Sequence, residues 1–532
     1  MKNTTNWFLL LTILCGIGCF SFFYLAYPYH MQHREQMLLF TFTCEQISSY
    51  FQQPAALACL LGDFFTQFFH LKVVGPLLVV LALMKLEVFT YISCHKWING
   101  WMSILIALLV FAWEGLRLCD INYSLSATVA LIGGIFLFIC TSAFKNRRSF
   151  LIATFLGIPI GYYLFGYGMF AFALCSVIEL LHRKDKQIQR IRLVISAIAI
   201  AVLSAILPGI SANHFLLMKK QAYSYPASTW YGKPNFSNER ILGLNTEYFH
   251  GNWNKINELV YQGTPSNDAA ICYNLANAMQ GKLPERLMYY YQPAGLALFM
   301  PIYDQSTYLT TQLAGEVWFR LGDMTMAEHA SILSMIFSPQ NKSSRMVKRM
   351  AEINLVNGET EAALKYLNIL SKTLFYKKWA EERMPGKESI AFKNWLTEKQ
   401  KYLPKADTLR LSSTDVSRSL HLLLKANPEN QMARDYLLCF DLLMKDLPTF
   451  ITDYNTFYQG KPNRLYAEAL MIHLFQKHAK PKEVKATGIH PSVIKDFNQY
   501  NLIYNQSQGN ASALESRFAH TYWFYYHFAN RN

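Results

Sequence analysis

Near its N-terminus the chain carries an uninterrupted apolar stretch, Trp7-Phe-Leu-Leu-Leu-Thr-Ile-Leu-Cys-Gly-Ile-Gly-Cys-Phe-Ser-Phe-Phe-Tyr-Leu-Ala-Tyr27. These 21 residues include no charged side chain. A helix of about 20 apolar residues crosses the hydrocarbon core of a bilayer. Lys2 precedes the stretch, and no small-residue cleavage site follows it. We therefore expect an uncleaved membrane-spanning helix rather than a signal peptide.

The rest of the first 212 residues repeats this pattern. Apolar runs occupy residues 72–94, 101–118, 123–144, 149–164, 165–181 and 193–211, which makes about seven spans in all. The stretch 149–181 is short for two spans, although basic residues flank both of its ends. It either crosses twice or dips into the membrane and returns, with Gly161, Gly166 and Gly168 available for a turn. The sequence leaves both alternatives open.

Basic residues mark the loops that we expect on the cytoplasmic side. Lys96 follows the second run, a basic stretch at 145–148 follows the fourth, and a basic stretch at 182–192 follows the sixth. With seven crossings, these loops and Lys2 share one side. We therefore predict a cytoplasmic N-terminus, with residues 28–71 and everything after 212 outside. In a Gram-negative bacterium this describes an inner-membrane protein with a periplasmic C-terminal domain.

The composition of the chain limits its functional class. Hydrophobic residues make up 52% of the 532 residues and charged residues only 16%. A net charge of +15 fits basic loops beside lipid headgroups, and no motif of DNA or RNA binding accompanies it. Eight of the ten cysteines lie at or before Cys175, where they act as small apolar residues. We expect membrane lipids as partners, and we expect no nucleic acid, no metal and no cofactor.

The second part of the chain is expected to be soluble and helical. Residues 213–237 are rich in Pro, Gly and aromatic residues and indicate a linker. From 238 to 532, apolar residues recur at helical spacing between short turns. Small and aromatic residues in two successive segments match the helix-packing positions of tetratricopeptide (TPR) repeats: Gly315, Trp318, Gly322, Ala327 and Pro339, then Gly358 and Ala363.

The predicted fold is therefore all-α. A transmembrane helix bundle occupies residues 1–212, with an outer loop at 28–71, and a linker at 213–237 leads to a TPR-like α-solenoid at 238–532. A helical domain without true repeats is the alternative for the last part, because short pattern matches produce false positives.

The outer loop holds the strongest candidate for a chemical site. Residues 37–51 and 55–70 are apolar on one face and indicate two helices that lie in the membrane interface. Just before them stand His30, His33, Arg34 and Glu35. Glu35 could deprotonate an acceptor hydroxyl while the three cations hold a lipid phosphate. The alternative is a solvated polar loop with a structural ion pair.

The layout of residues 1–212 resembles that of the C-type glycosyltransferases. It has one span, an outer loop with an early acid and interfacial helices, and then six more spans. The resemblance is one of topology, and it implies transfer of a sugar from a polyprenyl-phosphate donor. Glu35 matches the family's catalytic acid by place and charge, although that acid is usually Asp. Asp120 matches the family's secondary acid only because it lies in the second outer loop.

At the level of sequence, the chain resembles an uncharacterised family of bacterial multi-pass proteins with TPR-like tails. The resemblance rests on several short stretches: Glu35-Gln36, Leu39-Phe40, Thr43, Tyr50-Phe51, Gln67-Phe68-Phe69, Tyr273-Asn-Leu-Ala276 and Gly281-Lys-Leu283. It covers most of the chain. It implies the same architecture and no particular reaction.

Two functions stay open at this point. One is a membrane scaffold whose TPR-like domain binds an envelope protein or peptide in a helical groove. The other is a polyprenyl-phosphate-dependent sugar transferase with Glu35 as its acid or base. A transporter is a third interpretation, and it would need buried ionisable residues within the spans. The candidates for that role are all expected near helix ends: Lys85, Glu87, Glu114, Arg117 and Glu179.

Overall fold

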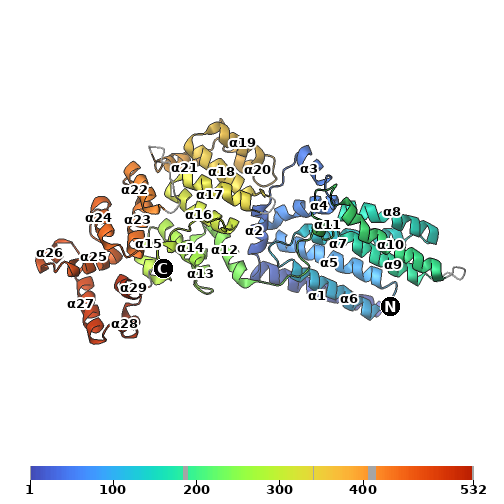
Figure 1. Ribbon diagram of the computed structural model, residues 1–532, viewed down its shortest axis with the longest axis horizontal. Coiled ribbons are helices and arrows are strands. Elements are labelled where there is room, and N and C mark those ends of the chain that lie inside the picture. The colour runs from blue at the N-terminus through green and yellow to red at the C-terminus, as the bar shows by residue number, and fades with distance from the viewer. Residues whose placement is uncertain (1, 184–189, 339–340, 405–414, 530–532) are drawn as a thin grey trace. The chain divides into compact units, whose positions relative to one another are not determined.

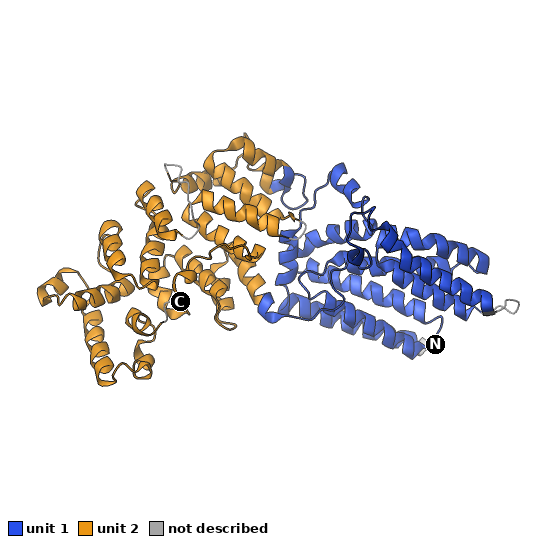
Figure 2. Cartoon of the chain, viewed as in Figure 1, with its two compact units in different colours: residues 1–239, 369–378 blue, residues 240–368, 379–532 orange. Residues whose placement is uncertain are grey.

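The computed structural model describes residues 2–183, 190–338, 341–404 and 415–529. Pro339 and residues 184–189 of the basic stretch 182–192 lie outside the described residues. Helices are the only regular elements in these described ranges, which confirms the all-α fold. The chain divides into two compact units, coloured separately in Figure 2. Unit 1 comprises residues 1–239 and 369–378, and unit 2 comprises residues 240–368 and 379–532.

Apolar helices form the body of unit 1 (Figure 1). Six stretches are long and apolar enough to cross a membrane, so the protein is multi-pass. The first runs through α1 (Lys2–Ser21) and a π-helical turn at Phe22–Ala26. The others are α5 (Val74–Cys94), α6 (Gly100–Arg117), α7 (Leu125–Ser142), α8 (Arg147–Phe165) and α10 (Arg190–Ser211). A shorter apolar helix, α9 (Gly168–His182), lies between α8 and α10 in the chain.

Contacts between loops show which helix ends lie together at one end of the bundle. Lys96, after α5, donates to the Oγ of Ser142 at the end of α7 at 2.6 Å. Arg183, after α9, donates to the carbonyl of Phe144 at 2.8 Å. We call this side of unit 1 the basic end. The loops expected to be cytoplasmic therefore meet at one end of the bundle.

The opposite end of unit 1 gathers the other connections. The hydroxyl of Tyr27 donates to the carbonyl of Cys119 at 3.1 Å, which joins the end of α1 to the end of α6. The guanidinium of Arg117 donates to the hydroxyl of Tyr167, between α8 and α9, at 3.2 Å. Because α9 then returns to the basic end through Arg183, the stretch 149–181 runs across the bundle twice. At 15 residues, α9 is about 22 Å long, which is short for a span.

Glycines allow the central helices α7 and α9 to approach closely. A Cβ atom on Gly134 would lie 2.0 Å from the carbonyl oxygen of Gly168, and one on Gly168 would lie 1.9 Å from that of Ala130. Small residues at such crossings let membrane helices gain van der Waals contact that lipid cannot supply. The crossing therefore depends on the absence of side chains at these positions.

The outer loop contains three helices instead of the two expected. They are α2 (Tyr29–Met37), α3 (Cys44–Tyr50) and α4 (Ala56–Thr66), and a 3₁₀ turn at Gln67–His70 follows α4. The first of the two expected helices, at 37–51, is interrupted, because residues 38–43 are not helical. There the amide of Phe42 donates to the carbonyl of Lys372 at 2.8 Å, a bond to a distant segment that sequence periodicity cannot reveal.

Residues 369–378 pack with unit 1, although they lie 130 residues beyond its main part in the sequence. The ring of Phe375 lies 4.1 Å from that of His70 and 5.4 Å from that of Phe68, measured between centroids. Together with the bond to Phe42, these contacts hold the segment against the outer loop. A short stretch of the second half of the chain thus completes unit 1.

Unit 2 is a succession of short helices. The short helix α11 (Lys219–Ala222) precedes unit 2 in the chain, and α12 (Phe236–His250) crosses its boundary at residue 240. Its first part contains α13 (Trp253–Val260), α14 (Asn267–Met279), α15 (Leu283–Arg286), α16 (Tyr308–Leu321), α17 (Met324–Phe337), α18 (Ser344–Asn357), α19 (Thr360–Leu370), α20 (Lys377–Glu381) and α21 (Ile390–Gln400). Its second part contains α22 (Val416–Ala426), α23 (Gln431–Leu443), α24 (Leu447–Phe457), α25 (Arg464–Gln476), α26 (Pro481–Ala486), α27 (Pro491–Gln506), α28 (Ala511–Phe518) and α29 (Tyr522–Phe528).

Most residues chosen for repeat packing lie inside helix pairs of unit 2. A Cβ on Gly315 would be 3.2 Å from the Cβ of Ala330, so α16 and α17 pack closely there. Gly322 ends α16 with a φ of +104°, and Gly358 ends α18 with a φ of +81°, conformations that favour glycine. Trp318 is buried and stacks on Phe299, with ring centroids 4.8 Å apart. The final pair of chosen residues, Ala327 and Ala363, is fully buried.

Candidate functional site

The four candidate residues of the outer loop lie on one short helix, α2. This helix begins after Pro28 and ends at Leu38, whose backbone is extended. His30, His33 and Glu35 are all buried. The stretch is thus helical and buried rather than a solvated loop.

Glu35 is held by a residue from the second half of the chain. The hydroxyl of Tyr376 donates to Oε1 of Glu35 at 3.0 Å. Tyr376 belongs to the segment 369–378 that packs on unit 1. A carboxylate that accepts such a bond is fixed in position, as a general base must be.

Arg34 connects the first outer loop to the second. Its Nη2 donates to the carbonyl of Asp120, and its Nε donates to the carbonyl of Ile121 at 3.4 Å. Burial lowers the pKa of Arg34 to about 10, and the nearby Asp120 carboxylate opposes that shift. The structure therefore brings Asp120 to α2, although the contact is to its backbone. The Oδ1 of Asp120 itself accepts from the amide of Asn122 at 2.8 Å.

His30 is tied to the start of α12 by Glu239. The Nδ1 of His30 lies 3.6 Å from Oε2 of Glu239 and 3.0 Å from the carbonyl of Tyr27. The amides of Tyr29 and His30 also donate to the Glu239 carboxylate. Burial lowers the pKa of His30, and the interaction of its ring N–H with the Glu239 carboxylate opposes that effect. Through these two amide contacts, Glu239 caps the beginning of α2.

These contacts define what the cluster around α2 can do. Arg34 binds backbone oxygens, and His30 binds a carboxylate. A lipid phosphate would have to replace these protein groups to reach the two side chains. The arrangement joins α2 to the second outer loop, to α12 and to the segment 369–378. It also presents a fixed carboxylate, Glu35, beside these joints.

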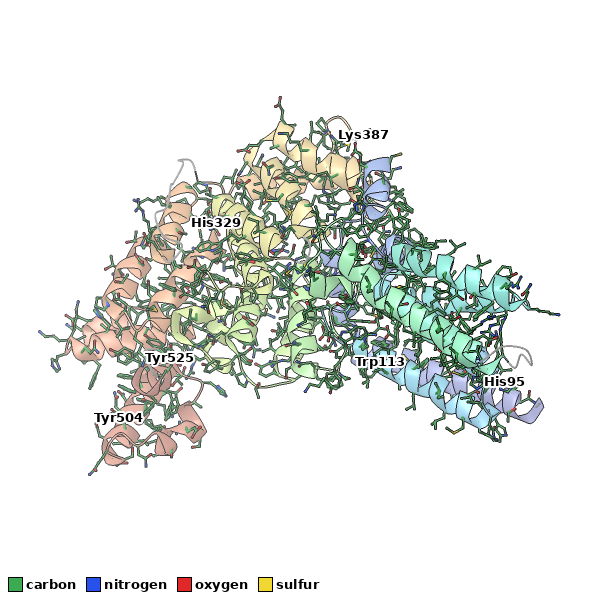
Figure 3. The ribbon with its side chains drawn as sticks, turned by 45° about the vertical axis from the view of Figure 1, so that its right-hand side comes forward. His95, Trp113, His329, Lys387, Tyr504 and Tyr525 are labelled. Carbon is green, nitrogen blue, oxygen red and sulfur yellow. The ribbon has the colours of Figure 1, made fainter. Side chains whose placement is uncertain are left out.

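A second polar cluster lies at the end of the bundle opposite the basic end. Glu114 and Arg117, one turn apart on α6, are fully buried and form an ion pair of 2.9 Å. The Oε1 of Glu114 accepts from the hydroxyls of Tyr123 and Thr128, both at 2.6 Å. Arg117 also donates to the carbonyl of Thr229 at 2.9 Å, and its guanidinium stacks 4.3 Å from the ring of Trp113, labelled in Figure 3. Both charges are thus fully satisfied by the protein.

The remaining candidates for a transporter differ in position. Glu179 lies near the end of α9, as expected, and pairs with Arg183 at 2.9 Å. Lys85 and Glu87, in contrast, lie well inside α5, so the expectation that they lie near helix ends is wrong. Among the residues that the structure describes, no group of three or more His, Cys, Asp or Glu side chains is arranged to hold a metal ion.

Comparison with known proteins places the chain in a family. A family model described as "Family of unknown function (DUF6057)" matches residues 3–529. The chain belongs to this family. The match includes the spans, the outer loop and unit 2, so the two units occur together as a characteristic of the family. No curated protein and no solved structure matches the chain.

Sequence reasoning missed three residues that contact the two polar clusters. Tyr376 and Glu239 lie far along the chain from α2, at separations of 341 and 209 residues. Thr229, which accepts from Arg117, lies in the linker. No periodicity or motif marks these residues. Only covariation between distant positions could have indicated such pairs.

Proposed function

We propose that the protein is a membrane-anchored interaction module. Unit 1 anchors the chain in the bacterial inner membrane, and unit 2 is a TPR-like helical domain on the periplasmic side that binds a segment of an envelope protein. The helix pairs with glycine at their crossings and ends support the repeat architecture. The observation that carries the proposal is a pocket in unit 2, between residues of its first part and the helix α29 of its second part.

The pocket has a volume of about 580 Å³, within the range of ligand-binding clefts. The stretch 288–296 and the C-terminal helix α29 form most of its wall. Aromatic rings dominate the lining: Tyr290, Tyr291, Phe524, Tyr525 and Phe528. Tyr525, labelled in Figure 3, is anchored because its hydroxyl donates to the carbonyl of Leu443 at 2.8 Å.

The lining indicates the chemistry of the occupant. The described residues that line the pocket are aromatic, aliphatic or neutral amide side chains. The amide of Gln292 is already bonded to Asn274 and to the carbonyl of Leu287. A site with aromatic walls and few open polar groups suits an uncharged, extended peptide segment, as in aromatic-lined grooves that bind proline-rich peptides.

Photo-crosslinking from the full-length protein in its native membrane tests this proposal. A photoreactive residue replaces Tyr291, which is 50% exposed at the pocket, and a matched control replaces Phe475, which is 62% exposed on α25. We expect a discrete adduct with one protein from position 291 and none from position 475. Leu296→Glu should remove the adduct, because it places a charge at the rim of an apolar pocket. Equal adducts at both positions would contradict the proposal.

A second candidate function, a lipid-linked sugar transferase, is favoured by one observation. Arg34 brings the second outer loop, with Asp120, to the helix that carries Glu35. The resemblance to the C-type glycosyltransferases assigns one acid to each of these two loops. In this alternative Glu35 is the acid or base, and His30, His33 and Arg34 contact the phosphate of a polyprenyl donor.

Native mass spectrometry of the gently solubilised protein separates the two functions. Co-purified polyprenyl phosphate, lost from a His33→Ala/Arg34→Ala variant, supports the transferase. Transfer of a glycan in reconstituted vesicles should then stop in Glu35→Gln. Bulk phospholipid alone, with intact transfer in Glu35→Gln, would rule out the catalytic role of Glu35.

A further inference from the structure

Three polar side chains follow one another along the chain at a spacing of four residues: Glu87 and Tyr91 on α5, and His95 directly after it. Each has a buried polar atom with no hydrogen-bond partner among the described residues. These atoms are Oε2 of Glu87, the hydroxyl of Tyr91 and Nδ1 of His95. Buried polar atoms are almost always hydrogen-bonded, to protein or to water. Three such atoms, two on α5 and one at its C-terminal end, therefore call for a common explanation.

This polar row faces the seam between α1 and α5. Thr12 on α1 donates to Oε1 of Glu87 at 2.9 Å. Phe8 on α1 stacks on Tyr91 at 3.9 Å, and Tyr91 stacks on His95 at 5.2 Å, between ring centroids. His95 directly follows α5 at the basic end of unit 1. The row thus leads from the basic end to a carboxyl group inside the bundle.

Among the described residues, no Lys, Arg or His side chain forms an ion pair with Glu87. Cys15 is the titratable side chain that faces it from α1. From α6, Ile104 and Ala107 pack against the same seam. Lys85, two residues earlier on α5, lies on another face of the helix and is exposed. An ionisable residue inside a membrane bundle without a countercharge is costly, and it usually marks a path for protons or ions.

We propose that the seam between α1 and α5 is a proton half-channel that opens at the basic end and terminates at Glu87. Adjacent members of the row are about 6 Å apart along the helix, a distance that one or two water molecules bridge. A proton binds one ring nitrogen of His95 while Nδ1 releases another to water. The hydroxyl of Tyr91 passes a proton on, and Oε2 of Glu87 accepts one to become a neutral carboxyl group.

The seam is closed beyond Glu87. A Cβ on Gly16 of α1 would lie 3.0 Å from the sulfur of Met84, so the two helices are in contact there. Further along, Val79, Leu83 and Phe23 belong to one buried apolar cluster. This packing closes the seam toward the opposite end, so the proposed path opens only at the basic end. The site takes up a proton from one side of the membrane, and it is independent of the pocket in unit 2.

Infrared spectroscopy of the full-length protein in lipid nanodiscs tests the proposal. The C=O stretch of a protonated carboxyl group shifts when its proton exchanges for deuterium after a rapid change to D₂O. Glu87→Gln assigns the signal, because its loss identifies the Glu87 carboxyl. Tyr91→Phe keeps the ring that stacks on Phe8 and removes only the hydroxyl. Ser93→Ala is the matched control, since the hydroxyl of Ser93 is already bonded to the carbonyl of Phe89 at 2.8 Å.

The expected result is a Glu87 signal that exchanges in the unmodified protein and in Ser93→Ala at the same rate. In Tyr91→Phe, exchange should be slower by roughly tenfold, the effect of raising one barrier by 1.4 kcal/mol. A Glu87 signal that exchanges equally fast in Tyr91→Phe would overturn the half-channel. So would a carboxyl signal that does not exchange at all in the unmodified protein.

Discussion

At the scale of single residues, the ion pair of Glu114 and Arg117 shows how unit 1 tolerates charge. Each charge has a neutral partner besides its counterion: Thr128 for Glu114 and the carbonyl of Thr229 for Arg117. Removing one member of a buried pair leaves the other charge uncompensated, which costs more than removing both. Because of this asymmetry, single and double variants of the pair test whether Glu114 and Arg117 interact.

We expect Glu114→Gln to lower the unfolding free energy by about 3–5 kcal/mol, since Arg117 then stays buried without a countercharge. Arg117→Met should have a similar effect. The double variant should be more stable than the sum of the two losses predicts. Thermal unfolding in nanodiscs, followed by tryptophan fluorescence, measures all three. Strictly additive losses would show that the two charges do not interact.

A pair of carboxyl groups in unit 2 provides a test of pH dependence. Asp441 on α23 and Asp453 on α24 are both buried, and His421 lies 2.9 Å from Oδ1 of Asp453. Burial raises the pKa of Asp441 from 3.8 to about 8, and the Asp453 carboxylate adds to the rise. The folded state therefore holds a proton that the unfolded chain releases near pH 4. Stability from this group is complete below that pH and declines as pH rises to about 8.

Asp441→Asn should remove this part of the pH dependence, because an amide stays neutral throughout. Between pH 5 and pH 8 each proton difference changes the unfolding free energy by about 1.4 kcal/mol per pH unit. The thermal midpoint of the unmodified protein should thus fall more steeply with pH than that of Asp441→Asn. Glu429→Gln, which neutralises an exposed carboxylate between α22 and α23, should keep the original slope. Equal slopes for all three proteins would place the proton elsewhere.

At the scale of elements, the sequence predicted what periodicity can encode. Apolar runs located the six helices of the described residues that are long and apolar enough to span, because a bilayer requires about 20 apolar residues whatever the neighbours are. Other elements follow from distant contacts. Residues 38–43 are extended because Phe42 binds Lys372, and Glu35 is fixed because Tyr376 reaches it. The candidate residues of α2 could thus be named from the sequence, but their partners could not.

The crossing of α7 and α9 gives a prediction for an element. Gly168→Ala should lower stability by about 1–3 kcal/mol, because the new Cβ would overlap the Ala130 carbonyl and force the helices apart. Gly134→Ala should act in the same way. Gly18→Ala on α1 is the control, since a Cβ there meets no atom within 4 Å. Thermal unfolding in nanodiscs compares the three. If Gly168→Ala and Gly134→Ala were as stable as Gly18→Ala, the close crossing of α7 and α9 would be contradicted.

At the scale of the whole molecule, the basic loops of unit 1 lie at one end of its helix bundle. Lys96, Arg183 and Ser142 meet at the basic end, and the outer loop lies with Arg117 and Tyr167 at the opposite end. Seven helix passes between two ends leave the termini of the bundle on opposite sides. Basic loops are retained in the cytoplasm during insertion. This combination gives a definite prediction for where unit 2 lies.

Reporter fusions after unit 2 measure that side directly. Alkaline phosphatase folds only after export from the cytoplasm, whereas green fluorescent protein exported unfolded stays dark. We expect an active phosphatase fusion and a dark fluorescent fusion, because a cytoplasmic N-terminus and seven passes place the C-terminus outside. A phosphatase fusion in the 95–99 turn, next to Lys96 at the basic end, should be inactive and serves as the control. The reverse pattern at both positions would mean that the bundle is inserted in the opposite orientation. A bright fluorescent fusion after unit 2, together with an inactive phosphatase in the 95–99 turn, would mean that one helix does not cross, and α9 with its 15 residues is the helix to examine.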